Sequence, residues 1–218
     1  MKEYQPILSS PHIEMASVYY EFGKERDYGK AQIFLEKYWL DNVTFLKNWL
    51  PVQNRIFQTP ITTLPEMLFK GDFKLLVTGG GCLFGKSDFE KMRDCMCSMG
   101  EENFVIIQND FGGSYKGPIF RLKFPCTITW EEMMSGDFVS QILCGYSNYE
   151  YMVYSGNGQW GKYAANEYKT PFNIIVFKSK YNQLFYENFK LMLEDNSTIE
   201  NYLSEEYKER ILSKYLKL

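Results

Sequence analysis

The spacing of hydrophobic residues changes along the chain, and the change separates a helical first part from the rest. From Asp27 to Leu50 the apolar positions keep a helical period, which predicts one long helix or two helices with a break near Asp41. We expect Pro51 to close this run, because proline lacks the N–H group that a helix interior needs. A shorter helix is predicted before it, over residues 10–23, where a serine–proline pair marks the start and a glycine the end.

Beyond an irregular segment with several prolines, at residues 51–65, the apolar runs shorten to the length of strands. Such runs lie at residues 73–77, 104–107, 119–124, 149–154, 160–164 and 172–177. Helical patterns lie at residues 87–99, 129–143, 181–193 and 197–215. We therefore expect a single domain, 1–218, in which a helical N-terminal layer (1–58) joins an α+β core (59–218). The predicted fold class is α+β, with a mixed, mainly antiparallel sheet of about six strands and helices at both ends of the sequence.

Capping residues place several helix starts inside this pattern. Thr129 and Glu132 form a capping box, in which each side chain is expected to bond the other residue's backbone N–H. Ser135 and Gly136 are expected to kink or end that helix, and Asp137 to cap the next one.

Residues 149–164 are predicted to form a β-hairpin, whose turn has an Asn-Gly pair at its centre. Alternation along its first strand puts aromatic rings on both sides of the strand. Two interpretations are open: the rings bind a protein partner, since Tyr and Trp dominate interface hot spots, or they pack in the core with one wet tyrosine face. The residues concerned are Tyr149, Tyr151, Tyr154, Trp160, Tyr163 and Tyr168.

A glycine-rich stretch from Gly80 to Ser87 satisfies the Walker A pattern, and it lies between an apparent strand and an apparent helix. In a nucleotide site of this kind, backbone N–H groups of the loop from Gly80 to Gly85 would hold phosphates, Lys86 would reach the β- and γ-phosphates, and Ser87 would bind Mg²⁺. Positions 83 and 84, however, carry a bulky leucine and phenylalanine where a phosphate cradle usually has small residues. Too few strand–helix units follow to build the parallel sheet of such an enzyme. The simpler interpretation is a glycine turn with Ser87 as the helix cap.

The remaining chemistry-bearing residues do not gather into a catalytic or metal-binding set. His12 is the only histidine, and a solvated position at the start of the first helix explains it. Cys95 and Cys97 are two residues apart on a predicted helix, so their side chains point about 200° apart and cannot ligate one ion together. The acids at 131, 132 and 137 are explained by helix starts, which favour negative charge. We therefore predict no catalytic residues, no metal site and no cofactor.

Charge and composition exclude further classes of function. The formal net charge of -3 and a pI near 5.4 argue against nucleic-acid binding, which needs a clustered basic excess. The apolar runs are shorter than the roughly 18 residues of a membrane span, and the N-terminus lacks the apolar region of a secretory signal. Five cysteines, an odd number, fit free thiols in a reducing compartment. We therefore expect a cytoplasmic protein with neither nucleic acid nor membrane as a partner.

The second half of the chain resembles small bacterial proteins of the immunity type, which are encoded beside polymorphic or contact-dependent toxins. The resemblance is carried by the order of five short segments: Ile128–Glu132, Ser135–Phe138, Tyr151–Tyr154, Gly158–Tyr163 and Pro171–Ile175. It implies a non-enzymatic cytoplasmic protein that binds a toxin domain and blocks it.

Three hypotheses follow for the function. The leading one is a protein-binding module, of the immunity type, that uses the hairpin aromatics to occlude a toxin domain. An alternative from another class is a nucleotide-binding enzyme that uses Lys86 and Ser87. The third is a homo-oligomeric structural module whose aromatic face is the subunit interface; the sequence alone does not set the oligomeric state.

Overall fold

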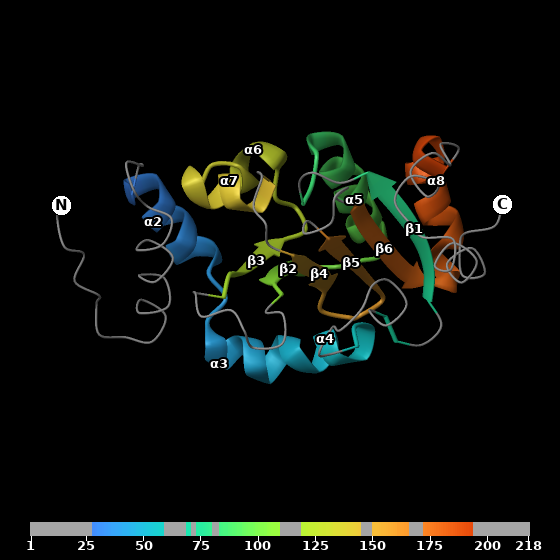
Figure 1. Ribbon diagram of the computed structural model, residues 1–218, viewed down its shortest axis with the longest axis horizontal. Coiled ribbons are helices and arrows are strands. Elements are labelled where there is room, and N and C mark those ends of the chain that lie inside the picture. Colours follow the sequence, from blue (N-terminus) through green and yellow to red (C-terminus); the bar gives the residue numbers. More distant parts are fainter. Residues whose placement is uncertain are drawn as a thin grey trace.

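The computed structural model of the chain describes residues 28–58, 69–70, 73–79, 83–109, 119–144, 150–165 and 172–193. Within these residues six strands form one sheet in the order β1-β6-β5-β4-β2-β3, and every neighbouring pair is antiparallel (Figure 1). The strands are β1 (Phe73–Gly79), β2 (Asn103–Gln108), β3 (Arg121–Pro125), β4 (Tyr151–Ser155), β5 (Trp160–Ala165) and β6 (Phe172–Lys178). The predicted α+β fold with a mainly antiparallel sheet of about six strands is therefore confirmed, and the described strands form no parallel pair. The helices predicted at 10–23 and 197–215 lie outside the described residues.

Helices cover both faces of the sheet, so the described part of the chain has three layers (Figure 1). One face, which we call the α5 face, carries α2 (Tyr28–Tyr38), α5 (Lys86–Ser98), α6 (Trp130–Met133), α7 (Phe138–Cys144) and α8 (Asn182–Leu193). The opposite face, which we call the α4 face, carries α3 (Asn42–Thr44), the π-helix η1 (Phe45–Trp49) and α4 (Leu50–Ile56). A single 3₁₀ turn, η3 (Ser179–Tyr181), joins β6 to α8.

Alternating residues of each strand pack against the two helical layers. On the α5 face, the ring of Phe177 in β6 stacks on Phe185 of α8, with centroids 4.0 Å apart. On the same face, Phe124 of β3 meets Tyr38 of α2 at 4.8 Å. On the α4 face, Tyr154 of β4 meets Trp49 of η1 at 6.0 Å. Both faces of the sheet are thus dry, and polar alternation along the strands is correspondingly weak.

The helix after Asp41 continues through Pro51, contrary to our expectation that the proline would end it. The predicted break near Asp41 is present: α2 ends at Tyr38, and Asp41 Oδ1 accepts a 2.9 Å hydrogen bond from the N–H of Thr44 as the cap of α3. Pro51 stands in the first turn of α4, directly after a π-helical turn in which Leu50 N–H donates to the carbonyl of Phe45. A proline is tolerated there because its missing N–H would have had no partner inside the new helix.

The connection from β1 through α5 to β2 has the predicted strand–helix–strand order, but the two strands are not neighbours. Four antiparallel steps in the sheet order separate β1 from β2, so the strands point the same way with three others between them. The helix cap also differs from the prediction. Gly85 is the N-cap of α5, and its carbonyl accepts a 2.9 Å bond from Phe89 N–H, while Ser87 lies inside the first turn. The extended backbone of Gly85 starts the helix two residues earlier than a serine cap would.

Candidate functional site

The four hairpin aromatics that the structure describes lie in the core. Tyr151, Tyr154, Trp160 and Tyr163 are each 0% exposed, whereas Tyr149 and Tyr168 lie outside the described residues. The predicted hairpin exists, with β4 and β5 paired across a turn that contains Gly158 at φ 67°. The four described aromatic side chains, however, do not form a contact surface for a partner or for a second subunit. Our alternative interpretation, core packing, is the one that holds for them, and it extends to both sides of the strand because helices cover both faces of the sheet.

One of these buried aromatics, Tyr154, helps to hold the α4-face layer on the sheet. The hydroxyl of Tyr154 donates to the carbonyl of Trp49 and to Oε1 of Gln53, both at 3.2 Å. Burial raises the pKa of this hydroxyl, so it remains a donor. Tyr163, on the same face of the neighbouring strand, accepts a 3.1 Å bond from Nδ2 of Asn109. The hydroxyls of Tyr154 and Tyr163 thus have structural partners.

The described part of the Walker-like stretch is anchored to the core. Leu83 and Phe84 are buried, and the carbonyl of Leu83 accepts a 2.5 Å bond from Nζ of the fully buried Lys162. Lys86 forms an ion pair with Glu131, with Nζ and Oε1 2.6 Å apart, and this bond raises the pKa of Lys86. Gly80 lies outside the described residues, Gly85 caps α5, and Ser87 is exposed. The neighbouring sheet is antiparallel, unlike the parallel sheet of P-loop enzymes, and nucleotide binding stays an untested prediction.

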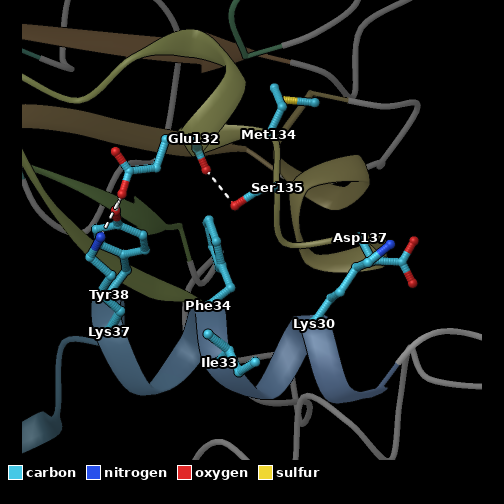
Figure 2. A pocket seen from close by; sticks show the side chains of 9 residues that line it. All are labelled: Lys30, Ile33, Phe34, Lys37, Tyr38, Glu132, Met134, Ser135 and Asp137. Carbon is cyan, nitrogen blue, oxygen red and sulfur yellow. Dashed lines mark hydrogen bonds and ion pairs between the residues drawn. The ribbon is translucent and has the colours of Figure 1, made fainter.

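An open groove of about 660 Å³ lies between α2 and the α6–α7 turn (Figure 2). One wall is α2, the other is the turn, and aromatic rings of α2 stand between them. The lining residues are Lys30, Ile33, Phe34, Lys37, Tyr38, Glu132, Met134, Ser135 and Asp137. Of these, the sequence had drawn attention only to those of the turn and to the buried stripe of α2. Ile33, an isoleucine on the polar side of an amphipathic helix, was the available signal for the rest.

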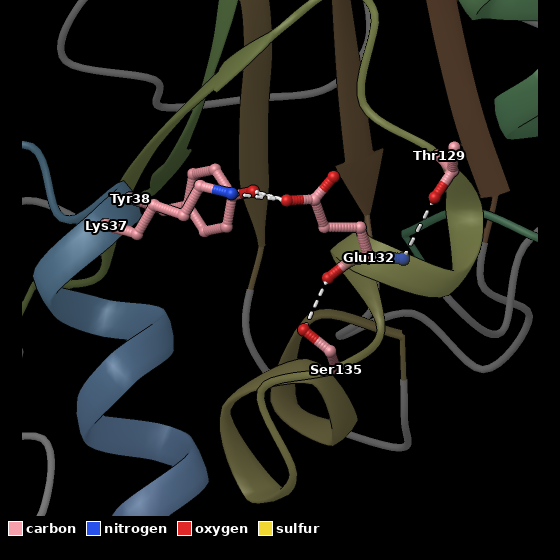
Figure 3. Close-up of polar contacts among 5 residues, drawn as sticks. All are labelled: Lys37, Tyr38, Thr129, Glu132 and Ser135. Atoms are coloured by element: carbon pink, nitrogen blue, oxygen red, sulfur yellow. Dashed lines mark hydrogen bonds and ion pairs between the residues drawn. The ribbon is translucent and has the colours of Figure 1, made fainter.

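Glu132 joins the two walls at one end of the groove. Its Oε1 accepts hydrogen bonds from Lys37 Nζ and Tyr38 OH, both at 2.5 Å (Figure 3). These bonds, that of Lys37 first, lower the pKa of the Glu132 carboxyl, and the same contact raises the pKa of Lys37. The pair therefore stays ionised at neutral pH.

The predicted capping box at this point is half present. The Oγ1 of Thr129 accepts a 3.1 Å bond from Glu132 N–H, so Thr129 caps α6 as predicted. The Glu132 side chain, however, is engaged with α2 instead of reaching back to the backbone of the cap (Figure 3). Ser135 completes the turn by donating from Oγ to the carbonyl of Glu132 at 2.8 Å. The carboxylate is thus held at the groove by a contact between residues that are far apart in sequence.

Gly136 allows the α6–α7 turn to rest directly on α2. A Cβ atom at this position would lie 2.7 Å from Cγ of Phe34 and 2.9 Å from Oγ of Ser140. The next residue, Asp137, has φ 51°, a left-handed conformation that Asp tolerates better than most residues. The turn is therefore fixed against α2, and the position of the second wall is set by close contact.

Large hydrophobic side chains that remain exposed are confined to one segment of the described chain. They are Tyr28, Ile33, Val43 and Leu46, with exposed fractions of 45%, 70%, 68% and 51%. We call these four residues the exposed apolar set. Ile33 lines the groove, whereas Val43 and Leu46 follow one another at helical spacing on α3 and η1. No sheet residue or C-terminal helix residue among those described contributes to the set.

No family model, curated protein or solved structure matches the chain. The resemblance to immunity-type proteins therefore rests on the sequence segments alone.

The described residues also bear on metal sites, reactive thiols and membrane-spanning helices. Within them no group of three or more His, Cys, Asp or Glu side chains could hold a metal ion. Cys95, Cys97 and Cys126 are free thiols, and burial raises the pKa of Cys95 and of Cys126 to about 12. Across the same ranges, no helix combines the length and apolar character needed to cross a bilayer. His12 falls outside these ranges.

Proposed function

We propose that the protein is a non-enzymatic, cytoplasmic binding module of the immunity type, which occludes a toxin domain with its helical N-terminal layer. The observation that supports this proposal is the pair Val43 and Leu46 of the exposed apolar set, which are 68% and 51% exposed on one helical stretch of the α4 face. Isolated exposed apolar residues are ordinary, but two large apolar side chains that are exposed side by side are typical of an interaction surface. The hairpin no longer offers such a surface.

Val43 and Leu46 are the anchors we assign to the partner. They lie three residues apart on one continuous helical stretch, so their side chains project from neighbouring turns of the same side. Their neighbours Phe45 and Trp49 are buried, which fixes the backbone that presents them. The stretch is π-helical from Phe45 to Trp49, a feature found frequently at functional sites. An apolar pair on a rigid support is what an interface hot spot requires.

Replacing Leu46 by aspartate is expected to weaken partner binding by about 30-fold or more, the effect of about 2 kcal/mol at a hot spot. The partner is first captured with the tagged wild-type chain, identified by mass spectrometry as a stoichiometric protein with a toxin-like domain, and purified for titration calorimetry. Ser87→Asp serves as the matched control, because it adds the same charge to an exposed first turn on the other face of the sheet, where a helix dipole favours it.

The proposal is contradicted if the Leu46→Asp protein melts like wild type and binds the purified partner with unchanged affinity. An equal loss of affinity in the Ser87→Asp control contradicts it as well, because the effect then does not belong to the N-terminal layer. Toxin inhibition by the wild-type chain, measured as restored growth of cells that express the toxin domain, checks occlusion separately from binding.

A further inference from the structure

The groove between α2 and the α6–α7 turn has walls of opposite charge. Lys30 and Lys37 project from α2, whereas Glu132 and Asp137 belong to the turn (Figure 2). The charges also match in position along the groove. Lys37 lies across from Glu132 at one end, and Lys30 extends toward Asp137 at the other. Between the two ends Ile33, 70% exposed, provides an apolar centre.

This arrangement is self-complementary under one particular symmetry. A two-fold axis that runs along the groove, in the plane of contact, exchanges the two walls of facing copies but keeps each position along the groove. Every cation of one copy then faces the carboxylate of the other copy at the same level, and each Ile33 side chain faces the α6–α7 turn of the other copy. A closed, isologous dimer needs such a patch, which is complementary to itself.

We propose that two copies of the chain associate through this groove, each laying its α2 helix against the α6–α7 turn of the other. The proposal goes beyond the proposed function, because the occupant of the groove is a second copy and not the foreign partner. Charge complementarity supports this occupant. A molecule that fits the groove must place carboxylates against the lysines of α2 and cations against the acids of the turn, and a second copy of the groove does both.

The Glu132 carboxylate can bind a lysine of the second copy without losing its own contacts. Oε1 of Glu132 is occupied by Lys37 and Tyr38 of its own chain, and within the described part of the chain Oε2 accepts from no group. A lysine of the second copy can therefore approach Oε2 without breaking the existing pair. The wall that carries Glu132 and Asp137 is held in place by the close contact at Gly136. The surface is thus formed before association.

The proposed dimer leaves the partner-binding residues accessible. The groove is formed by elements of the α5 face, whereas α3 and η1, which carry Val43 and Leu46, lie on the α4 face (Figure 1). A dimer would therefore cover Ile33 and present two copies of the Val43–Leu46 surface to foreign partners.

A charge-exchange experiment tests the proposal on the purified chain without any partner. Lys30→Glu and Asp137→Lys are each expected to raise the dimer dissociation constant in sedimentation equilibrium by about tenfold or more, which corresponds to about 1.4 kcal/mol. Each change turns both symmetric contacts from attraction to repulsion. An equimolar mixture of the two variants is expected to recover the dimer, because every contact in the mixed pair again joins opposite charges. Lys190→Glu on exposed α8 is the matched charge-reversal control and should sediment like wild type.

Ile33→Asp provides a second, independent arm. It places a charge on the α2 wall between the two charged contacts and should abolish the dimer, and its exposed position predicts a native melting temperature. This substitution also tests the dimer without changing Asp137, whose positive φ could strain a lysine placed there. Circular dichroism melts confirm folding for each variant.

The proposal is overturned if the wild-type chain is a monomer at all concentrations, if Ile33→Asp leaves the dimer intact, or if the mixture of folded variants fails to recover it. None of these results affects the proposed function, which depends on the titration of a purified foreign partner and on Leu46. Conversely, a dimer that shows the mixing effect stands even if no foreign partner is found.

Discussion

Replacing Trp160 by alanine is expected to lower the free energy of unfolding by about 3–5 kcal/mol, the usual cost of removing a large buried aromatic side chain. The indole is 0% exposed, and it lies on β5 with paired strands on both sides. Its cross-strand neighbour on β6, Phe177, is also fully buried and stacks on α8. The surrounding elements therefore have little freedom to collapse into the cavity. Urea unfolding, followed by far-UV circular dichroism, measures the change.

Trp160→Phe is the matched control for this substitution. It keeps most of the apolar volume and removes the indole N–H, which is buried without a hydrogen-bond partner among the described residues. A smaller loss of stability than in Trp160→Ala is therefore expected. If Trp160→Ala keeps wild-type stability and instead weakens partner binding, the indole belongs to a contact surface, and the assignment of the hairpin to the core is wrong.

A methyl group added at Gly161 is expected to destabilise the protein by about 1–3 kcal/mol, as overpacking of a filled core usually does. The Cβ of an alanine there would lie 2.8 Å from Cγ2 of Ile56 and 3.0 Å from Cζ of Phe57. Both side chains are fully buried at the end of α4, and β5 is hydrogen-bonded on both edges. Because β5 is held on both edges, α4 must lift from the sheet. Equilibrium unfolding in urea, compared through the midpoint and the slope, gives the magnitude.

Gly156→Ala is the control for Gly161→Ala, in the same hairpin. The nearest atom to its added Cβ would be Cη2 of Trp49 at 3.8 Å, an ordinary van der Waals distance. Its stability should be unchanged, or raised by up to about 1 kcal/mol through the lower entropy of the unfolded chain. Equal destabilisation by both substitutions would mean that α4 does not approach the sheet at Gly161 as closely as the structure has it.

Local sequence signals were sufficient for much of the fold. Strand-length apolar runs located all six strands, and the Asn-Gly turn located the β4–β5 hairpin. Thr129 was identified as a helix cap, and its hydrogen bond to Glu132 N–H is present. These features are encoded within a few neighbouring residues, so a single sequence is enough to predict them.

Two predictions were wrong because one residue or segment carries two local signals, and the sequence does not show which of them prevails. Pro51 was expected to end a helix, but a proline is also a good first residue of one, and the π-helical turn before it makes the second role possible. Ser87 was expected to cap α5, but Gly85 starts the helix earlier. The role of Pro51 and the start of α5 both depend on the backbone conformation of several residues, and the identity of a single residue does not determine that conformation.

The site required information that no local pattern contains. Aromatic rings on both sides of β4 were ambiguous, because a strand pattern does not tell whether helices cover one face of a sheet or both. Double coverage explains why Tyr151 and Tyr154, on opposite sides of one strand, are both fully buried. The bond from Lys37 to Glu132 joins residues 95 positions apart and emerges only when α2 meets the α6–α7 turn. Besides the turn residues and the buried stripe of α2, the available signal of the groove was Ile33, an isoleucine on the polar side of an amphipathic helix.

Hydroxyl-radical footprinting of the purified chain, read out by mass spectrometry and normalised to the urea-unfolded chain, tests most directly which residues are core and which are surface. We expect strong protection of Trp160, Tyr151 and Tyr163, which are fully buried, and little protection of Leu46, which is half exposed. Oxidation of Trp160 and Tyr163 in the folded protein at the rate seen in the unfolded chain would contradict the account and return the hairpin to the surface.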